Sequence, residues 1–194
     1  KNDFEGLITY SSVSAESFNF VGVPKEKILI APLSIKKTIL NSSLTREPHS
    51  LLWVGRGYPS KGLDIAVQVS KHLDVKLTVL GALQPKLVNW LKKFPKVDYL
   101  GRLDRIQVFQ QMQMHVILIV PTVESYGLAV YEALQNGMKI ITSPYVGINE
   151  WLEDNPNLYI CEEFKLESFI NMTNKALNAH AVKKNVQEIQ VDDL

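Results

Sequence analysis

From about residue 50 onward, short runs of apolar and often β-branched residues alternate with longer stretches of helical period, and this alternation constrains the fold more than any other feature. Several runs are apolar at every position, as expected where helices cover both faces of a parallel sheet. The pattern therefore predicts an α/β protein with a doubly wound, Rossmann-like parallel sheet of about six strands. The predicted strands are 51–54, 76–80, 97–100, 116–120, 139–142 and 157–160, and the predicted helices are 62–73, 84–93, 104–113, 127–136, 147–153 and 165–180.

The first 45 residues do not follow this rhythm. A strand-like segment at 7–10, a helix and a second strand-like segment at 27–31 precede a polar stretch at 41–50. We interpret residues 1–45 as a lead-in from a domain upstream, residues 46–180 as the main domain, and residues 181–194 as a polar tail. Six strands with their helices use the chain to about residue 180, so we expect no second complete domain within it.

The charge and composition of the chain argue against binding to nucleic acid and against a membrane span. With 21 basic and 20 acidic residues the net charge is +1, which does not favour binding to nucleic acid. No apolar run of the sequence approaches the roughly 20 residues that span a bilayer. The single cysteine, Cys161, is interpreted as a small core residue in a reducing compartment. We therefore expect a soluble, cytoplasmic protein.

A ligand site is expected where two unusual loops meet. In a sheet of order 3-2-1-4-5-6 the first and fourth strands are neighbours, and ligands bind at their carboxyl ends. The first strand runs into the glycine-rich loop 55–62, whose cations Arg56 and Lys61 are suited to a diphosphate. The loop is not a Walker A motif, since Leu63 stands where that motif has lysine, and it lacks the third glycine of the dinucleotide fingerprint. On its residues alone, a tight turn with two solvated cations explains it equally well.

The fourth strand runs into loop 121–127, which leads into a helix beginning near Gly127. The N–H groups of a helix N-terminus bind anions, so this helix would face the same diphosphate. The helix is apolar on nearly all sides apart from Glu132, and a carboxylate in such surroundings needs hydrogen-bond donors. A ribose diol would supply two donors. A salt bridge to a lysine or arginine within the fold is the alternative, and the chemistry alone slightly favours it.

Six short motifs follow one another in a fixed order: Val54-Gly-Arg56 with Lys61-Gly62, Leu80-Gly81, Tyr99-Leu-Gly101, Glu124-(x)7-Glu132, Ala133-Leu-Gln-Asn-Gly137 and Ile140-Ile-Thr-Ser143. This ordered set resembles the donor domain of the retaining GT-B glycosyltransferases, which include glycogen synthases, sucrose synthases and many transferases of polysaccharide and lipopolysaccharide biosynthesis. The resemblance is clearest over residues 50–160. Segments 8–12 and 27–32 also resemble the family's crossing between its two domains.

The resemblance implies a role for each matching residue. Arg56 and Lys61 would neutralise the departing diphosphate, and Glu132 would hold the ribose hydroxyls. Glu124 would lie beside the sugar and its phosphate, while loop 101–104 would line the base. Arg56, Lys61 and Glu124 are thus the implied catalytic residues, and the implied substrate-binding residues are Gly55, Arg56, Lys61, Gly101, Arg102, Leu103, Glu124, Ser125, Tyr126, Gly127, Leu128 and Glu132.

By the same resemblance, the chain is the C-terminal half of a GT-B fold and binds a nucleoside-diphosphate sugar, with UDP the commonest donor nucleotide of the family. No metal or other cofactor is implied, since the sequence has no Asp-x-Asp motif and its four histidines are scattered. The sugar would pass with retention to a glycan, lipid or similar acceptor bound by an N-terminal domain, which could also attach the enzyme peripherally to a membrane. We expect this chain alone to bind its donor without transferring the sugar.

Other functions are compatible with the same fold. A UDP-sugar 2-epimerase-like enzyme, a non-catalytic accessory subunit and an unrelated nucleotide-binding domain are the alternatives, although the motif order favours a transferase. Two positions depart from the family pattern. Lys139 stands where many relatives have proline, and Gly147 stands alone where a pair of glycines is usual.

Overall fold

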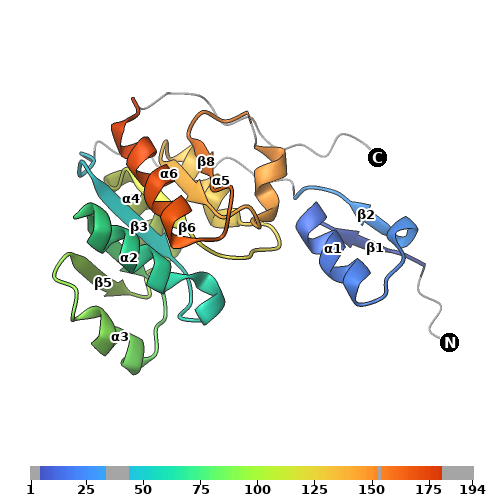
Figure 1. The fold of residues 1–194 in the computed structure, drawn as a ribbon, viewed down its shortest axis with the longest axis horizontal. Coiled ribbons are helices and arrows are strands. Elements are labelled where there is room, and N and C mark those ends of the chain that lie inside the picture. The colour runs from blue at the N-terminus through green and yellow to red at the C-terminus, as the bar shows by residue number, and fades with distance from the viewer. Residues whose placement is uncertain (1–4, 34–43, 153, 181–194) are drawn as a thin grey trace.

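The structure is a computed structural model that describes residues 5–33, 44–152 and 154–180. Those residues form a small βαβ unit at the N-terminus and a larger α/β domain (Figure 1). Within these ranges no helix combines the length and apolar character needed to cross a membrane. The predicted polar tail at 181–194 and residues 34–43 of the predicted lead-in lie outside the described residues.

The large domain is built on a six-stranded sheet in which every pairing is parallel and the strand order is β5-β4-β3-β6-β7-β8. This confirms the predicted doubly wound topology: β3 and β6, the first and fourth strands of the sheet, are neighbours. The strands are β3 Ser50–Val54, β4 Lys76–Leu80, β5 Val97–Gly101, β6 Ile117–Val120, β7 Lys139–Thr142 and β8 Leu158–Ile160.

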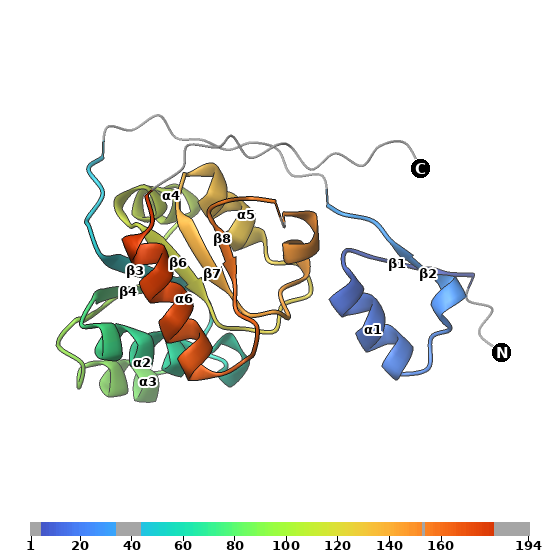
Figure 2. The same cartoon turned by 45° about the horizontal axis from the view of Figure 1, so that its top comes forward.

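Helices cover both faces of the sheet, in two layers that Figure 2 shows clearly. Alternate residues of β3 point to opposite layers, so that Leu51 and Trp53 belong to one core cluster and Leu52 to the other. The first cluster includes residues of α2, α3 and α6, and the second includes residues of α4 and α5. The helices are α2 Leu63–Leu73, α3 Pro85–Leu91, α4 Arg105–Met114, α5 Leu128–Gln135 and α6 Leu166–Asn178.

The predicted helix at 147–153 is instead a short 3₁₀ helix, η3, at Gly147–Trp151. Its first N–H groups are bonded outside the helix, because Gly147 donates to the carbonyl of Glu124 and Ile148 to that of Tyr126. The remaining bonds are of the tighter i→i+3 kind, such as Leu152 N–H to the Asn149 carbonyl. The segment is therefore bound to loop 121–127.

The N-terminal unit has the strand–helix–strand order expected from its sequence. It comprises β1 Leu7–Thr9, α1 Ser12–Phe20 and β2 Ile28–Ile30, and the two strands pair in parallel. The unit docks on the large domain through the start of α1, where the Ser12 N–H donates to the Glu150 carboxylate at 3.0 Å. The indole N–H of Trp151 donates to the Tyr10 carbonyl at 3.1 Å. The unit is thus fixed beside η3 at the carboxyl edge of the sheet.

Candidate functional site

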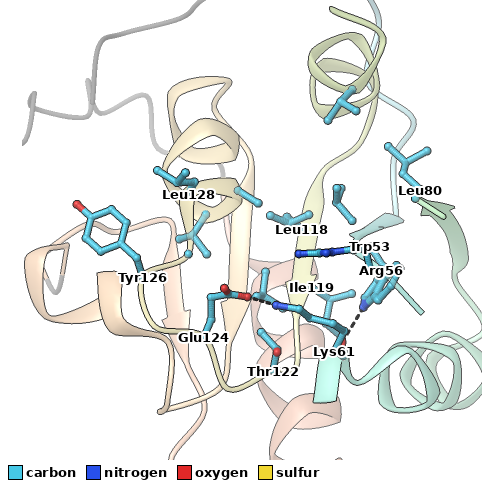
Figure 3. A pocket seen from close by; sticks show the side chains of 18 of the residues that line it. Trp53, Arg56, Lys61, Leu80, Leu118, Ile119, Thr122, Glu124, Tyr126 and Leu128 are labelled. Atoms are coloured by element: carbon cyan, nitrogen blue, oxygen red, sulfur yellow. Dashed lines mark hydrogen bonds and ion pairs between the residues drawn. The ribbon is translucent and has the colours of Figure 1, made fainter. Parts of the chain in front are cut away.

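A cavity of about 830 Å³ opens at the carboxyl ends of β3 and β6, where the two loops were expected to meet (Figure 3). Its walls come from the ends of β3, β4 and β6, from loops 55–62 and 121–127, and from the first turn of α5. The topology puts these segments together, because the crossovers from β3 and β6 run in opposite directions along the sheet.

The loop after β3 is held by glycines that allow other backbone segments to approach very closely. A Cβ atom at Gly81, which has a φ of +126°, would collide with the carbonyl oxygen of Gly55. A Cβ at Gly62, with a φ of +61°, would collide with the Pro121 carbonyl in the other loop. The indole of Trp53 donates to the Lys61 carbonyl at 3.0 Å and fixes the end of the loop. A larger residue at Gly62 would force the two loops apart, and one at Gly81 would push the end of β4 away from the first loop.

The loop after β6 is fixed by hydrogen bonds on both sides. The Thr122 hydroxyl donates to the Ser60 carbonyl of the first loop at 2.7 Å. On the other side, the Glu124 N–H donates to the Tyr145 carbonyl at 3.0 Å, and Gly147 donates to the Glu124 carbonyl at 3.0 Å. Glu124 therefore sits on a backbone whose position is set by β3, β6 and the segment after β7.

The side chains of Lys61 in the first loop and Glu124 in the second form an ion pair that joins the two loops (Figure 3). They are 25% and 32% exposed, so the pair is largely withdrawn from solvent. Coulomb interactions are stronger there than at a fully exposed surface. Arg56 and Arg102 also line the cavity, so its lining carries more positive than negative charge. Such a cavity is suited to an anionic ligand.

The N-terminus of α5 enters the same cavity, which is lined by Gly127, Leu128 and Ala129. Gly127 adopts a φ of +107° as the N-cap, and no side chain caps the helix. The first N–H groups of an α-helix have no i−4 acceptor within it and carry the positive end of the helix dipole. Here Val130 donates to the Gly127 carbonyl at 2.9 Å, so the donors that face the cavity come from the residues before it. They add directed donors to the charge of the nearby cations.

Glu132 lies one turn further along α5 and is paired with Arg105, whose Nη2 is 3.1 Å from its Oε1. The Glu132 side chain is 23% exposed, whereas that of Arg105 is 71% exposed. Burial raises the pKa of the Glu132 carboxyl, and Arg105 acts in the opposite direction. The salt bridge that the sequence left open is therefore present, with a partner that extends into solvent.

The sequence profile described as "Glycosyl transferases group 1" matches residues 36–189, which is most of the chain. The chain belongs to the glycosyl transferases group 1 family. Its six-stranded parallel sheet with helices matches the GT-B glycosyltransferase fold.

Two curated relatives illustrate the similarity. The GPI3 subunit of phosphatidylinositol N-acetylglucosaminyltransferase from Saccharomyces cerevisiae is 26% identical over 69% of this chain and 32% of its own length. The uncharacterized glycosyltransferase MJ1178 from Methanocaldococcus jannaschii is 25% identical over 71% of this chain and 40% of its own. The chain thus spans about a third to two fifths of these relatives.

Solved structures of glycosyltransferases share the fold. WaaG, a glycosyltransferase involved in lipopolysaccharide biosynthesis, matches with a TM-score of 0.71 at 20% identity, over 89% of this chain and 53% of WaaG. Anabaena HepE in complex with UDP and glucose matches with a TM-score of 0.73 at 16% identity, over 90% of this chain and 54% of HepE. At this level of identity the likeness shows the fold.

In this group 1 family member, most of the sequence-predicted site residues meet in one place. Gly101 lies at the end of β5, where its carbonyl accepts from the Gly81 N–H at 2.8 Å, and it shapes the wall without lining the cavity. Glu132 also lies outside the lining. The predicted residues that line the cavity are Gly55, Arg56, Lys61, Arg102, Leu103, Glu124, Ser125, Tyr126, Gly127 and Leu128.

Sequence reasoning missed several residues of the cavity. Tyr10 and Leu33 come from the N-terminal unit and the segment that follows it, and their distance along the chain hid them. Thr122 was a loop residue without an assigned role, although its hydroxyl is a donor that can bond to a carbonyl of the facing loop. In the part of the chain that the structure describes, no group of three or more His, Cys, Asp or Glu side chains could hold a metal ion.

Proposed function

We propose that this cavity binds the nucleoside-diphosphate sugar donor of a retaining glycosyl transfer, with UDP as the nucleotide. The observation that carries the proposal is the Lys61–Glu124 pair, which joins the two loops beside the N-terminus of α5. A cation, a carboxylate and a helix N-terminus in one cavity match a diphosphate linked to a polyhydroxylated sugar. The UDP and glucose bound by the structurally similar HepE support this choice of ligand.

We propose a partner for each part of the donor. Arg56, Lys61 and the first turn of α5 would bind the diphosphate, and Arg102 with Leu103 would line the base. Lys61 would turn from Glu124 to a phosphate oxygen when the donor binds, which leaves the Glu124 carboxylate to accept from sugar hydroxyls. Glu132, which lies just beyond the part of α5 that lines the cavity and is paired with Arg105, would accept from the ribose hydroxyls.

In the proposed reaction the bond between the anomeric carbon and the diphosphate oxygen breaks, and the diphosphate leaves with the bonding electron pair. Arg56, Lys61 and the α5 N-terminus would stabilise the negative charge on the leaving group, with donors already oriented before the reaction. The acceptor hydroxyl would form the new bond on the same face of the sugar and pass its proton to the departing phosphate oxygen. The configuration at the anomeric carbon is thereby retained.

We propose that the acceptor is a glycan or a lipid, held mainly by an acceptor-binding part that this chain does not contain. The names of GPI3 and WaaG refer to phosphatidylinositol and lipopolysaccharide, which supports acceptors of this class. Because the chain spans 32% and 40% of its curated relatives, we propose that it binds the donor without transferring the sugar on its own. The cytoplasm is the proposed location, with peripheral membrane contact through the acceptor-binding part.

A thermal-shift series with UDP, GDP, ADP and their glucose and N-acetylglucosamine conjugates tests the proposal. A ligand at about 100 times its dissociation constant stabilises the fold by roughly 2.7 kcal/mol, which gives a clear shift. We expect the largest shift from UDP or a UDP-sugar. A chain that responds to none of these nucleotides contradicts the donor-binding proposal, and efficient transfer by the 194-residue chain contradicts the need for a further part.

A further inference from the structure

Tyr10 is the aromatic side chain that the N-terminal unit contributes to the cavity, and it comes from outside the six-stranded domain. It immediately follows β1 and is 42% exposed. None of the roles assigned to the diphosphate, base or ribose involves it. An exposed aromatic ring at the wall of a cavity presents an apolar face that a ligand can cover.

The position of Tyr10 is fixed through its backbone. Its carbonyl accepts from the Trp151 indole at 3.1 Å. The next residue, Ser11, donates from its hydroxyl to the Ser125 carbonyl at 2.5 Å, and Ser14 donates to the same carbonyl at 3.2 Å. Tyr10 is therefore attached to the loop that carries Glu124, although about a hundred residues separate the two in sequence.

The ring of Tyr10 is also supported from one side. It packs edge-on against the ring of Tyr126, with 5.9 Å between the centroids and 66° between the planes. Tyr126 is 4% exposed, and its hydroxyl donates to the Leu33 carbonyl at 3.2 Å. A buried and hydrogen-bonded partner restricts the motion of the Tyr10 ring. A ligand that stacks on this ring therefore costs the protein little conformational entropy.

Tyr10 stands at the Glu124 end of the cavity. In Figure 3, Glu124 lies between Tyr126, the ring partner of Tyr10, and the Lys61 and Arg56 side chains. The cavity volume of about 830 Å³ lies near the upper end of the roughly 300–1,000 Å³ range of ligand pockets, so there is room beyond a diphosphate. Pyranose rings present a face of C–H groups, which stack favourably on the electron-rich face of an aromatic ring.

We propose that Tyr10, supported by Tyr126, forms a subsite for a pyranose ring at the Glu124 end of the cavity and acts as a specificity-determining residue. This inference rests on the proposed function. The pyranose belongs either to the donor or to the acceptor, and both present the same C–H face to the ring. The subsite makes the N-terminal unit a part of the binding site, as well as a structural neighbour of it.

Calorimetric titration of the 194-residue chain tests the subsite in two arms. The first measures the dissociation constants of UDP, UDP-glucose and UDP-N-acetylglucosamine for the wild type and for Tyr10→Ala, Tyr10→Phe and Phe20→Ala. Phe20 is the matched control, because it is an aromatic residue of the same unit, is 91% exposed and lies outside the cavity lining. The second titrates methyl α-D-glucopyranoside and the methyl glycoside of N-acetylglucosamine into protein saturated with UDP.

Tyr10→Ala is expected to leave UDP affinity unchanged and to weaken one pyranose ligand by about threefold to tenfold relative to UDP. Tyr10→Phe is expected to keep most of that affinity, and Phe20→Ala all of it. A loss confined to the UDP-sugars assigns the subsite to the donor, and a loss confined to the methyl glycosides assigns it to the acceptor. Unchanged ratios in both arms, or an equal loss for UDP itself, overturn the inference while donor binding stands. A wild type that binds no nucleotide overturns the proposed function.

Discussion

The two edges of the six-stranded sheet carry similar residues but differ in how those residues are used. At the carboxyl edge, the cavity contains Arg56, Lys61 and Glu124. At the amino edge, a hollow of about 360 Å³ lies beside the starts of β3, β4 and β5 and is lined by Lys76 and Lys96, among others. Both places are concave and charged, so concavity and charge alone do not distinguish them.

The charges at the amino edge neutralise one another in solvent. Lys76 pairs with Glu47 at 3.2 Å and with Asp98 at 3.5 Å, and Lys96 pairs with Asp74 at 2.6 Å. The side chains of these residues are 41% to 83% exposed, and ion pairs at such exposure contribute little. At the carboxyl edge, the Lys61–Glu124 pair is less exposed and further cations share the cavity. Surplus positive charge in a partly enclosed site is what an anionic ligand requires.

The two edges of the sheet also differ in which residues occupy the backbone positions with positive φ. At the amino edge the left-handed positions are occupied by His49 and Asp74, with φ of +54° and +56°. At the carboxyl edge the corresponding conformations fall on Gly62 and Gly81, where neighbouring carbonyl groups occupy the place of a Cβ atom. The amino edge tolerates side chains at such positions, whereas the carboxyl edge requires their absence. This close approach of backbones shapes the cavity.

Gly81→Ala tests the backbone difference and has the largest expected effect. The new methyl group would meet the Gly55 carbonyl in a strained conformation, so we expect a loss of about 3 kcal/mol or more in the free energy of unfolding. Urea denaturation measures the loss. Gly22→Ala is the control, since Gly22 also has a positive φ but no atom within 4 Å of the added Cβ, and about 1 kcal/mol is expected there. Equal losses in the two variants would remove close approach as the cause.

Lys61→Ala and Arg56→Ala test the difference in charge. Each is expected to weaken the binding of UDP by about 1.5–3 kcal/mol, the range for hydrogen bonds to charged groups, and to change uridine binding much less. Lys96→Ala removes a cation from the amino edge and should leave the binding of UDP and of uridine unchanged. Isothermal titration of UDP and uridine provides the measurement. If UDP and uridine weakened equally at the carboxyl edge, the diphosphate would not be bound there.

Glu132→Gln distinguishes a ribose contact from a purely structural salt bridge. We expect binding of UDP to weaken by about 1 kcal/mol and binding of 2′-deoxy-UDP to change little, because only the ribonucleotide offers both hydroxyls. The partner Arg105 is 71% exposed, so the loss of the salt bridge itself should barely alter the melting temperature. A lower melting temperature with unchanged discrimination between the two nucleotides would favour the structural role.

The sequence predicted the fold well and the site in part. Strand order and the meeting of the two loops follow from local periodicity and from the handedness of crossovers, which are properties of the chain itself. The Lys61–Glu124 pair was not foreseen, because each residue was assigned to a ligand separately and their contact depends on side-chain directions across two loops. The place of Tyr10 in the cavity depends on how a distant unit docks, and no local pattern encodes it.

Lys139 shows a further limit of sequence reasoning. It stands in a strand position where many relatives have proline, and its departure from the pattern had no evident meaning. In the structure it is buried, and its ammonium donates to the carbonyls of Ala176 and Ala179 at 2.6 and 2.5 Å, at the C-terminal end of α6. A cation favours the negative end of a helix dipole. This contact joins elements far apart in the chain, so the sequence alone did not indicate it.

A pH titration of stability has the smallest expected effect and concerns His115, which is buried in the large domain. Its Nδ1 lies 2.8 Å from the Gln111 carbonyl and its Nε2 lies 2.8 Å from the Thr78 hydroxyl. Burial lowers the pKa of His115, so the unfolded chain takes up the proton first as the pH falls. Stability should be complete above the usual histidine range and should decline below about pH 6.5.

Urea denaturation from about pH 8 to about pH 5 measures this decline. His72→Gln, which changes a histidine in the last turn of α2, should preserve the decline. His115→Gln should flatten it. A flat profile in the wild type would show that the buried imidazole does not contribute.

The central claim is that the carboxyl edge of the sheet binds a nucleoside diphosphate through the two loops and the N-terminus of α5. A crystal structure of the chain with UDP tests it most directly. We expect the diphosphate within hydrogen-bond distance of Arg56, Lys61 and the N–H groups at the start of α5, with the Lys61–Glu124 pair separated. A diphosphate bound at the amino edge between Lys76 and Lys96, or one bound elsewhere while Lys61 stays paired with Glu124, would contradict it.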